Sequence, residues 1–329
     1  MRPLLSIIIP VFNVEKYIGE CFDSIKRQKM KEEVEIICVN DGSTDRSGFI
    51  CDEYAKIDKR FKIFHQKNKG VSSARNLGIK MSKGKYIAWI DPDDYISDNW
   101  WDNIKNILEN DKKVDIIFFD YIILKDKKYI KKTFANKSSY ISKKDFLYNL
   151  SGNQKIQGQL WQKIFKKELL KQYTFPENIS FLEDYAMLSR FVLKAENIYY
   201  LSKKLYVYRL REHSITKDVS IEKVYMSYLI VKEVYDYLQK NNFEVSRIGY
   251  LIQALKVCIS YYKTNNNDRK NFIDKFDICR NLIDKNILYV LISKDCNFIN
   301  KFKFLLYKCN LISLGLYLKK FCGRFISLL

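Results

Sequence analysis

The stretch of sequence that most constrains the fold is residues 86–96, where an apolar run leads directly into three carboxylates. The run YIAWI suits a strand buried on both faces, as in a parallel sheet. Asp91, Asp93 and Asp94 follow, and Pro92 ends the strand and favours extended geometry at Asp91. Carboxylates thus lie at the carboxyl end of a buried strand, where open α/β sheets bind ligands. A divalent cation that shares phosphate oxygens would relieve their repulsion, and a surface turn that caps the next helix is the alternative.

Strand and helix patterns alternate through the N-terminal part of the chain. We expect strands at residues 6–11, 35–39, 61–65 and 86–90, and helices at 15–28, around 50–57 and at 71–81. This alternation indicates an α/β fold with a parallel sheet and right-handed crossovers. The later elements expected are helices at 100–108, 143–150, 161–170 and 184–194, strands at 114–119, 198–201 and 205–208, and a hairpin at 121–132. From about residue 221 the pattern is helical.

The formal net charge of +20 points to an anionic partner such as nucleic acid, anionic lipid or a phosphorylated substrate. Lysines are spread along the chain without an arginine-rich run, zinc-finger spacing or a recognition helix, so no nucleic acid is expected. The eight cysteines occur singly, which is typical of a reducing cytosol. No apolar run approaches the length that spans a bilayer, and the run after Met1 is interpreted as a first strand, not a signal peptide.

Residues at the ends of the first two strands are expected to face the acidic cluster across one cleft. Asp41 ends the second strand, and Phe12 and Asn13 follow the first. A carboxylate there would accept a hydrogen bond from a base or ribose, and Phe12 would stack on a base. Residues 42–44 would open a helix whose amides favour anions, or form an ordinary turn with an N-cap. Arg75, on the helix that leads to the acidic strand, suits a diphosphate or faces solvent.

Five ordered motifs resemble those of the family 2 inverting glycosyltransferases, which have a GT-A nucleotide-diphospho-sugar domain. They are SIIIPVFN at 6–13, VNDGSTD at 39–45, GVSSARNLG at 70–78, GKYIAWIDPDD at 84–94 and FLED at 181–184. The resemblance implies a Rossmann-like, mixed and mainly parallel sheet in a catalytic domain at 1–215. Within it, a nucleotide-binding half would occupy 1–98 and an acceptor half 99–215. A helical C-terminal extension would occupy 216–329.

The resemblance also implies a donor site. Asp41 would read a uracil-type base in a pocket walled by Pro10, Phe12 and Asn13, and Arg75 would meet the diphosphate or the ribose. Phe12 stands where the family often has tyrosine, which keeps the stacking face and loses a hydroxyl.

The resemblance further implies a metal site. Asp91 and Asp93 resemble the Asp-x-Asp motif, in which Asp93 would ligate Mg²⁺ or Mn²⁺ and Asp91 would hold the ribose or a metal-bound water. His213 belongs to a stretch, 208–216, that resembles a loop closing over the diphosphate, where it would complete the metal shell or touch phosphate. Asn40 stands where the family more often has aspartate, so the base-reading role rests on its neighbour alone.

The pair Glu183 and Asp184 resembles the family's catalytic pair, with Asp184 as the base that takes the acceptor hydroxyl's proton and Glu183 on the acceptor side. The alternative is an acidic pair placed for the helix dipole. Trp161 resembles a residue near the acceptor, where it would pack on a sugar ring, and core packing is the alternative. His65, at the end of a strand, is interpreted as structural.

The last stretch, 300–329, carries six basic residues, no acidic one, and many apolar ones. Such a stretch is typical of a helix on an anionic membrane surface, and packing on the catalytic domain or a second subunit is the alternative.

The function expected is transfer of a hexose or N-acetylhexosamine from a UDP-sugar to a glycan or lipid-linked acceptor. The family's character suggests bacterial lipopolysaccharide or capsule assembly, in the cytoplasm or on the inner face of the membrane. A sugar nucleotidyltransferase would need a glycine-rich triphosphate loop after the first strand, and PVFNV at 10–14 is not one. A non-catalytic basic binding module would tolerate loss of Asp93.

Overall fold

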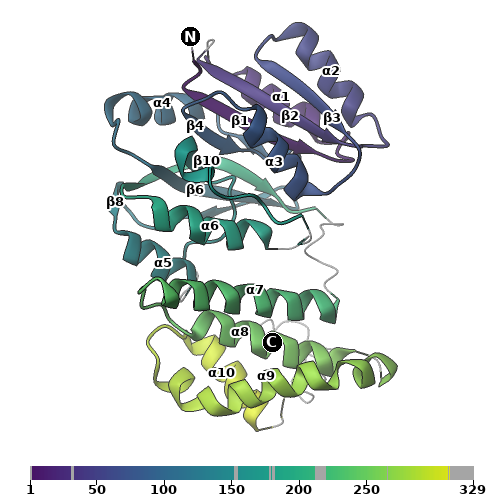
Figure 1. The fold of residues 1–329 in the computed structure, drawn as a ribbon, viewed down its shortest axis with the longest axis vertical. Helices are drawn as coiled ribbons and strands as arrows, with labels where there is room; N and C mark the ends of the chain where they lie inside the picture. Colours follow the sequence, from purple (N-terminus) through teal and green to yellow (C-terminus); the bar gives the residue numbers. More distant parts are fainter. Residues whose placement is uncertain are drawn as a thin grey trace. The chain divides into compact units, whose positions relative to one another are not determined.

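The computed structural model describes residues 2–30, 33–151, 155–177, 179, 182–211, 220–264, 266–309 and 311. The chain divides into two compact units (Figure 1). Unit 1 comprises Met1–Asp145 and Gly158–Ser214, and unit 2 comprises Phe146–Gln157 and Ile215–Leu329. The boundary predicted at residue 215 lies outside the described residues. The grouping of 146–157 with the C-terminal helices was not predicted.

Unit 1 is built on one ten-stranded sheet flanked by helices. The strands are β1 (Leu5–Val11), β2 (Val34–Asp41), β3 (Phe61–Gln66), β4 (Tyr86–Trp89), β5 (Tyr95–Ile96), β6 (Ile116–Lys125), β7 (Lys128–Lys132), β8 (Ser139–Ile141), β9 (Lys163–Lys166) and β10 (Ile198–Arg209). The helices are α1 (Ile18–Lys26), α2 (Ser47–Ile57), α3 (Val71–Met81), α4 (Trp100–Asn110), the 3-10 helix η1 (Lys167–Leu170) and α6 (Glu183–Lys194). Helix α5 (Lys143–Ser151) contains the first boundary between the units.

The sheet is mixed and mainly parallel, as predicted. Its order is β3-β2-β1-β4-β9-β6-β10-β5, with β7 on β6 and β8 on β10. The four strands β1 to β4 run parallel, as do β6 and β10. Strand β9 lies antiparallel between β4 and β6. The carboxyl ends of β1, β2 and β4 therefore share one edge of the sheet.

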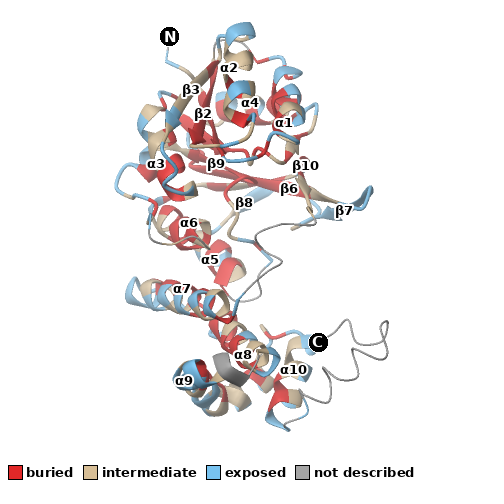
Figure 2. Ribbon diagram, turned by 90° about the vertical axis from the view of Figure 1, so that its right-hand side faces the viewer, coloured by how far each residue is buried: buried red, intermediate tan, exposed pale blue. Residues whose placement is uncertain are grey.

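Helices cover both faces of the sheet in unit 1 (Figure 2). Ile7 and Ile9 of β1 belong to a core cluster with buried residues of α1, α2 and α4. Ile8 points to the other face, where α3 packs on β1 and β2. A Cβ atom at Gly78 of α3 would lie 2.4 Å from the Ile8 Cγ2 atom, so this close approach requires glycine. Burial on both faces explains the continuous apolar runs of the strands.

The helix predicted at 161–170 is wrong. Strand β9 and the 3-10 helix η1 occupy this stretch, because Ile164 and Phe165 fill the space between β4 and β6 and pair with both strands. The two strands predicted at 198–201 and 205–208 are one strand, β10, with register shifts against β6 between Leu201 and Tyr206. The predicted hairpin is formed by β6 and β7.

Unit 2 is helical, in agreement with the predicted C-terminal extension. Its helices are α7 (Ile221–Lys240), α8 (Ile248–Lys263), α9 (Asn266–Ile292) and α10 (Phe298–Lys308). Helix α8 packs against both α7 and α9, and its Leu251, Leu255 and Cys258 are buried. Among the residues that the structure describes, no helix is long and apolar enough to cross a membrane.

Candidate active site

The loops that follow β1 and β2 meet at the carboxyl edge of the sheet. Pro10 is buried within β1, whereas Phe12 beyond its end is exposed. Asn13 has a left-handed backbone, with φ of 49°, and its Oδ1 accepts a hydrogen bond of 2.8 Å from the Thr44 amide. The Ser43 hydroxyl in turn accepts from the Asn13 amide at 3.2 Å. The edge therefore combines an exposed aromatic ring with a turn that is held by hydrogen bonds.

Asp41, at the end of β2, is buried and holds the loop before α3. Its Oδ1 accepts from the Gln66 Nε2 atom at 2.7 Å and from the Lys69 amide at 2.9 Å, and its Oδ2 accepts from the Gly70 amide at 2.8 Å. A carboxylate has about four acceptor positions. Asp41 thus orders the loop that begins α3 and retains about one position for a ligand.

Asn40 and His65 are structural. The Asn40 Nδ2 atom lies 2.9 Å from the His65 Nδ1 atom, and the Asn40 Oδ1 atom accepts from the Ser43 amide. His65 also contacts Asp52, with 3.0 Å between Nε2 and Oδ1. The prediction that residues 42–44 open a helix is wrong, because α2 begins only at Ser47. The Ser43 and Thr44 amides instead donate hydrogen bonds to the side chains of Asn40 and Asn13.

Asp94 anchors the end of β10 to the acidic loop. The Tyr206 hydroxyl donates to Asp94 Oδ2 at 2.9 Å, and the Arg209 amide donates to Asp94 Oδ1 at 2.8 Å. Burial, with repulsion from Asp93 and Asp91, raises the pKa of Asp94 well above its usual range. The third carboxylate of the cluster is therefore an internal support, a role that sequence reasoning missed.

Asp91 and Asp93 are the members of the cluster that are partly exposed. Burial, reinforced by Asp93, Asp184 and Glu183 and opposed by Arg75, raises the pKa of Asp91 to about 7. Asp93 Oδ2 lies 2.6 Å from an Nη2 nitrogen of an arginine that follows β10, Arg211. The cluster thus concentrates negative charge that a cation would offset.

Arg75 and Glu183 form a buried ion pair between α3 and α6. The Arg75 Nη1 atom donates to Glu183 Oε1, and each side chain is only 9% exposed. Arg75 also interacts electrostatically with Asp91 and Asp184, and its buried Nε has no hydrogen-bond partner among the residues described. The solvent-facing alternative for Arg75 is therefore wrong, and an unused donor remains for a ligand.

Asp184, in the first turn of α6, has a raised pKa. Burial is the main cause and Glu183 adds to it, whereas Arg75 and Lys163 oppose it. Lys163 of β9 is fully buried, and its Nζ donates to the Gln159 carbonyl at 2.6 Å. Burial lowers the pKa of Lys163 to about 7, and Asp184 opposes this shift. The sequence offered no signal for Lys163, which stands among other lysines.

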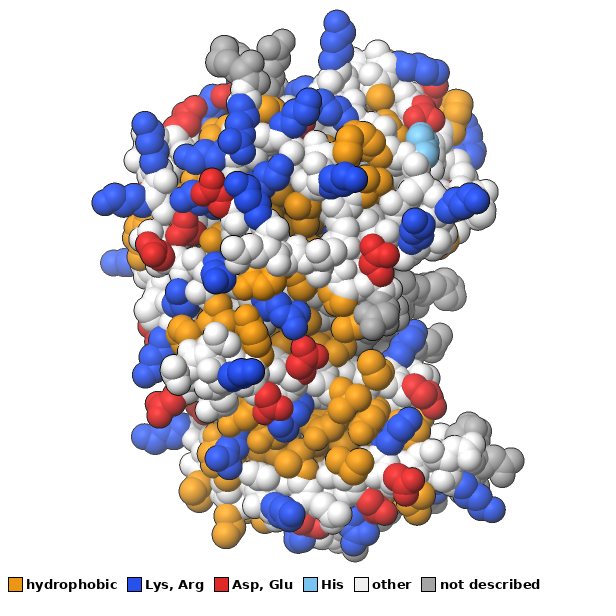
Figure 3. All heavy atoms as spheres, in the orientation of Figure 1, with side chains coloured by type: hydrophobic (Ala, Val, Ile, Leu, Met, Phe, Trp, Pro, Cys, Tyr) orange, Lys and Arg blue, Asp and Glu red, His pale blue; other side chains and the backbone are white. Residues whose placement is uncertain are grey.

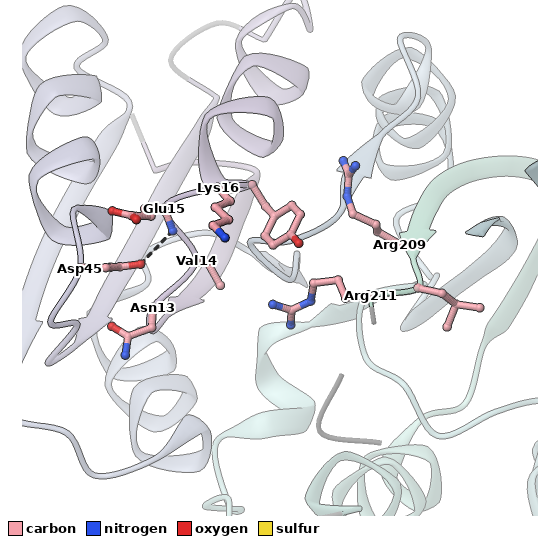
Figure 4. A pocket seen from close by; sticks show the side chains of 9 residues that line it. Asn13, Val14, Glu15, Lys16, Asp45, Arg209 and Arg211 are labelled. Atoms are coloured by element: carbon pink, nitrogen blue, oxygen red, sulfur yellow. Dashed lines mark hydrogen bonds between the residues drawn. The ribbon is translucent and has the colours of Figure 1, made fainter. Parts of the chain in front are cut away.

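A hollow of about 660 Å³ opens beside the strand edge (Figure 4). Its lining includes Asn13 and Lys16 from the loop after β1, and Arg209 and Arg211 from the end of β10 and the segment after it. In Figure 4 the Arg211 side chain extends toward the loop that carries Asn13. The lining also includes the carboxylates of Glu15 and Asp45, so its three cationic side chains leave a small positive balance that favours an anionic ligand. The sequence analysis identified the stretch 208–216 by its resemblance to a loop that closes over the diphosphate, but it did not single out these two arginines.

Two predicted contacts lie elsewhere or outside the structure's description. Trp161 is buried and stacks on Tyr206 and Tyr208, with ring centroids 4.4 Å and 5.5 Å away. This is the core-packing arrangement that was the alternative to an acceptor contact. His213 lies outside the described residues.

The donor atoms at Asp91 and Asp93 fit a hard cation. Both are carboxylates, and Mg²⁺ and Mn²⁺ prefer oxygen ligands. The described part of the chain contains no group of three or more histidine, cysteine, aspartate or glutamate side chains that would hold a metal by itself. A cation here would therefore take part of its shell from phosphate and water, as Mg²⁺ commonly does.

The chain is similar to known glycosyltransferases. Residues 6–195 match the model of the family described as glycosyl transferase family 2. The chain is 36% identical over 222 residues to the uncharacterized glycosyltransferase EpsJ of Bacillus subtilis, a match covering 66% of this chain and only 64% of EpsJ. It is 28% identical over 270 residues to the GalNAc(5)-diNAcBac-PP-undecaprenol β-1,3-glucosyltransferase of Campylobacter jejuni, covering 79% of this chain and 81% of that protein.

A solved structure shares the fold. The structure of S. aureus TarS 1–349 in complex with UDP-GlcNAc superposes with a TM-score of 0.63 at 19% identity, covering 98% of this chain and 92% of that one. The family match over residues 6–195 and this GT-A fold lead to one conclusion: the chain belongs to glycosyl transferase family 2.

Proposed function

We propose that this chain is an inverting glycosyltransferase that moves a hexose or N-acetylhexosamine from a UDP-sugar to a glycan acceptor. The observation that carries the proposal is the gathering of Asp91, Asp93, Asp184 and Arg75 at the carboxyl edge of the sheet, beside a basic hollow. The TarS structure in complex with UDP-GlcNAc supports the choice of a uridine nucleotide.

The donor would bind across the ends of β1, β2 and β4. Phe12 offers an exposed ring for stacking on the base, and Asp41 offers its remaining acceptor position to a base N–H. Arg211 and Lys16 would neutralise the diphosphate from the hollow. Asp93, with Asp91, would hold Mg²⁺ or Mn²⁺, which when bound offsets the charge on the leaving diphosphate.

Asp184 would act as the general base. Because Arg75 holds Glu183, the Glu183 carboxylate is committed to an ion pair, and we propose a positioning role for it in place of an acceptor contact. Among the residues that the structure describes, the Asp184 carboxylate accepts a hydrogen bond only from the Tyr185 amide, at 2.7 Å. A raised pKa strengthens a carboxylate as a base near neutral pH. Asp184 would take the proton of the acceptor hydroxyl as that oxygen attacks the anomeric carbon.

The acceptor would be a bacterial surface polysaccharide or its lipid-linked precursor. The Campylobacter jejuni relative, whose name describes transfer to an undecaprenol-linked saccharide, supports this class. Such acceptors lie at the inner face of the cytoplasmic membrane, where we place the enzyme's work, with 300–329 as the expected membrane contact.

The proposal is tested by measuring UDP release from a panel of UDP-sugars and the anomeric configuration of the product. Asp184→Asn should lower the transfer rate by about two to four orders of magnitude and leave UDP binding intact. Asp98→Asn, at an exposed aspartate, is the matched control and should leave the rate unchanged. An unchanged rate in Asp184→Asn, or a product with retained configuration, would reject the mechanism.

A further inference from the structure

Helices α9 and α10 leave large apolar side chains in solvent where the two helices join. Leu288, Ile292 and Phe298 are 74%, 78% and 81% exposed, and Phe302 and Leu305 are exposed as well. We call these five residues the α9–α10 corner. Single exposed apolar residues are ordinary, but five large ones at the adjoining ends of two helices point to an interaction site.

The corner has a defined pattern. Phe298, Phe302 and Leu305 are spaced by four and three residues and so share one side of α10. The opposite side of α10 carries Phe304 and Tyr307, which are buried. Helix α10 is therefore apolar on two sides, and within the described part of the chain only the side with Phe304 and Tyr307 is buried.

Apolar exposure on α9 increases toward its C-terminal end. Ile273 and Ile278 are 48% and 51% exposed, whereas Leu288 and Ile292, next to α10 in the chain, are 74% and 78% exposed. The strongest apolar exposure of α9 therefore lies where the helix leads into α10.

The charge around the corner is positive. Helix α10 has three lysines and no acidic residue, and Lys294 lies in the connection between the helices. From 291 to 311 the sequence has Asp295 as its single acidic residue. Figure 3 shows apolar side chains on the face of unit 2 that it presents, with both basic and acidic side chains around them. A partner for the corner must therefore be apolar and anionic together.

Two other occupants match this charge poorly. A second copy of the chain, joined through a symmetric interface, would bring like-charged lysines together. The following residues 312–329 carry Lys319, Lys320 and Arg324 and no acid, so they too would add positive charge. An anionic phospholipid surface offers an apolar layer beneath phosphate groups and fits both requirements.

We propose that the α9–α10 corner docks on the surface of an anionic phospholipid bilayer, with Phe298 and its apolar neighbours in the acyl boundary and the lysines at the phosphates. This deepens the proposed membrane location and rests on the proposed function only for the presence of a lipid-linked acceptor. Each lysine near an anionic surface contributes about 1 kcal/mol, which is about fivefold in affinity.

The test is co-sedimentation of the full chain with vesicles of phosphatidylcholine alone and of phosphatidylcholine mixed with phosphatidylglycerol. The wild type should bind the anionic vesicles far more tightly than the neutral ones. Ile292→Ser/Phe298→Ser/Phe302→Ser should abolish binding, and Lys301→Gln/Lys303→Gln should weaken it about 25-fold. All three apolar positions are exposed, so the chain should still fold.

The matched control is Phe49→Ser/Ile57→Ser, which removes two exposed apolar side chains from α2 of unit 1 and should bind vesicles as the wild type does. Undiminished vesicle binding by the triple variant, or no binding by the wild type, overturns the proposal. A concentration-dependent dimer in light scattering that the triple variant loses would overturn it in favour of a second copy.

A parallel UDP titration separates this proposal from the transferase proposal. Vesicle binding without UDP binding would reject the transferase and keep the docking surface. UDP binding without vesicle binding would reject the docking surface and keep the transferase proposal.

Discussion

Replacing Arg75 should destabilise unit 1 more than removing the charge of its partner Glu183. Arg75 lies among three carboxylates, since it pairs with Glu183 and interacts electrostatically with Asp91 and Asp184. Arg75→Met leaves these three groups without the arginine, whereas Glu183→Gln leaves the arginine with two carboxylates. The structure therefore predicts an asymmetric effect for the two halves of one ion pair.

The magnitude follows from burial. At a charge separation of about 4 Å and an effective dielectric constant of about 20, the attraction is about 4 kcal/mol. Both side chains are 9% exposed, so solvent screens the pair little. Removing one partner of a buried pair costs about 3–5 kcal/mol, which we expect for Arg75→Met. Glu183→Gln should cost about 1–2 kcal/mol, because the guanidinium keeps other partners.

Urea unfolding followed by tryptophan fluorescence measures this effect, because all four tryptophans belong to unit 1. The double variant Arg75→Met/Glu183→Gln should cost less than the sum of the single variants, with a coupling of about 2 kcal/mol. Arg27→Met, which breaks the exposed pair with Asp98, is the control and should cost less than about 1 kcal/mol. Equal costs for the two single variants, or additive costs, would refute the reasoning.

Three further predictions concern the packing of Gly78, the burial of Lys163 and the loop before α3 that Asp41 holds. Gly78→Ala should lower the free energy of unfolding by about 1–3 kcal/mol, because the added Cβ would collide with Ile8. Gly19→Ala, whose Cβ meets nothing within 4 Å, is the control and should raise it by up to about 1 kcal/mol. The midpoints of urea unfolding measure both changes. Burial lowers the pKa of Lys163 to about 7, so its charge destabilises the folded chain fully below pH 7 and the cost disappears as pH rises toward 10.5. Lys163→Met should therefore stabilise the chain relative to wild type by about 5 kcal/mol more at low pH than at high pH. A pH-independent difference in urea unfolding would contradict this. Asp41→Ala should weaken UDP binding and speed hydrogen exchange of the two loop amides that bond to its carboxylate, and unchanged exchange would show that the carboxylate does not hold the loop.

The N-terminal half of the sheet could be predicted because its signals are local. Strands β1, β2 and β4 are largely apolar and fully buried, and parallel strands with helical crossovers place their carboxyl ends together. Strand β9 could not be predicted, because a short apolar stretch flanked by lysines fits a helix as well as a strand. Its pairing with β4 and β6 decides the outcome, and that pairing is a tertiary effect.

The place of the candidate site in the fold could be predicted, but the hydrogen bonds and packing contacts among its residues could not. The positions of Asp41 and Asp91 could be predicted, because each follows an apolar run that reads as a strand and therefore lies at the carboxyl edge of the sheet. The hydrogen bonds from the Tyr206 hydroxyl and the Arg209 amide to Asp94 join residues more than a hundred positions apart. Nothing in a single sequence indicates that such distant residues are in contact. Lys163 resembles a surface lysine in the sequence, and only the packing around β9 removes it from water.

Titration calorimetry decides whether the strand edge binds a uridine nucleotide through Asp93 and a divalent cation. UDP, and GDP for comparison, are titrated into the wild type and Asp93→Asn in the presence and absence of Mn²⁺. Asp98→Asn, which changes an exposed aspartate close by in sequence, is the control. We expect Mn²⁺-dependent binding that prefers UDP, persists in Asp98→Asn and is lost in Asp93→Asn. If the wild type binds no nucleotide, or if Asp93→Asn leaves the Mn²⁺-dependent binding unchanged, the proposed donor site is wrong.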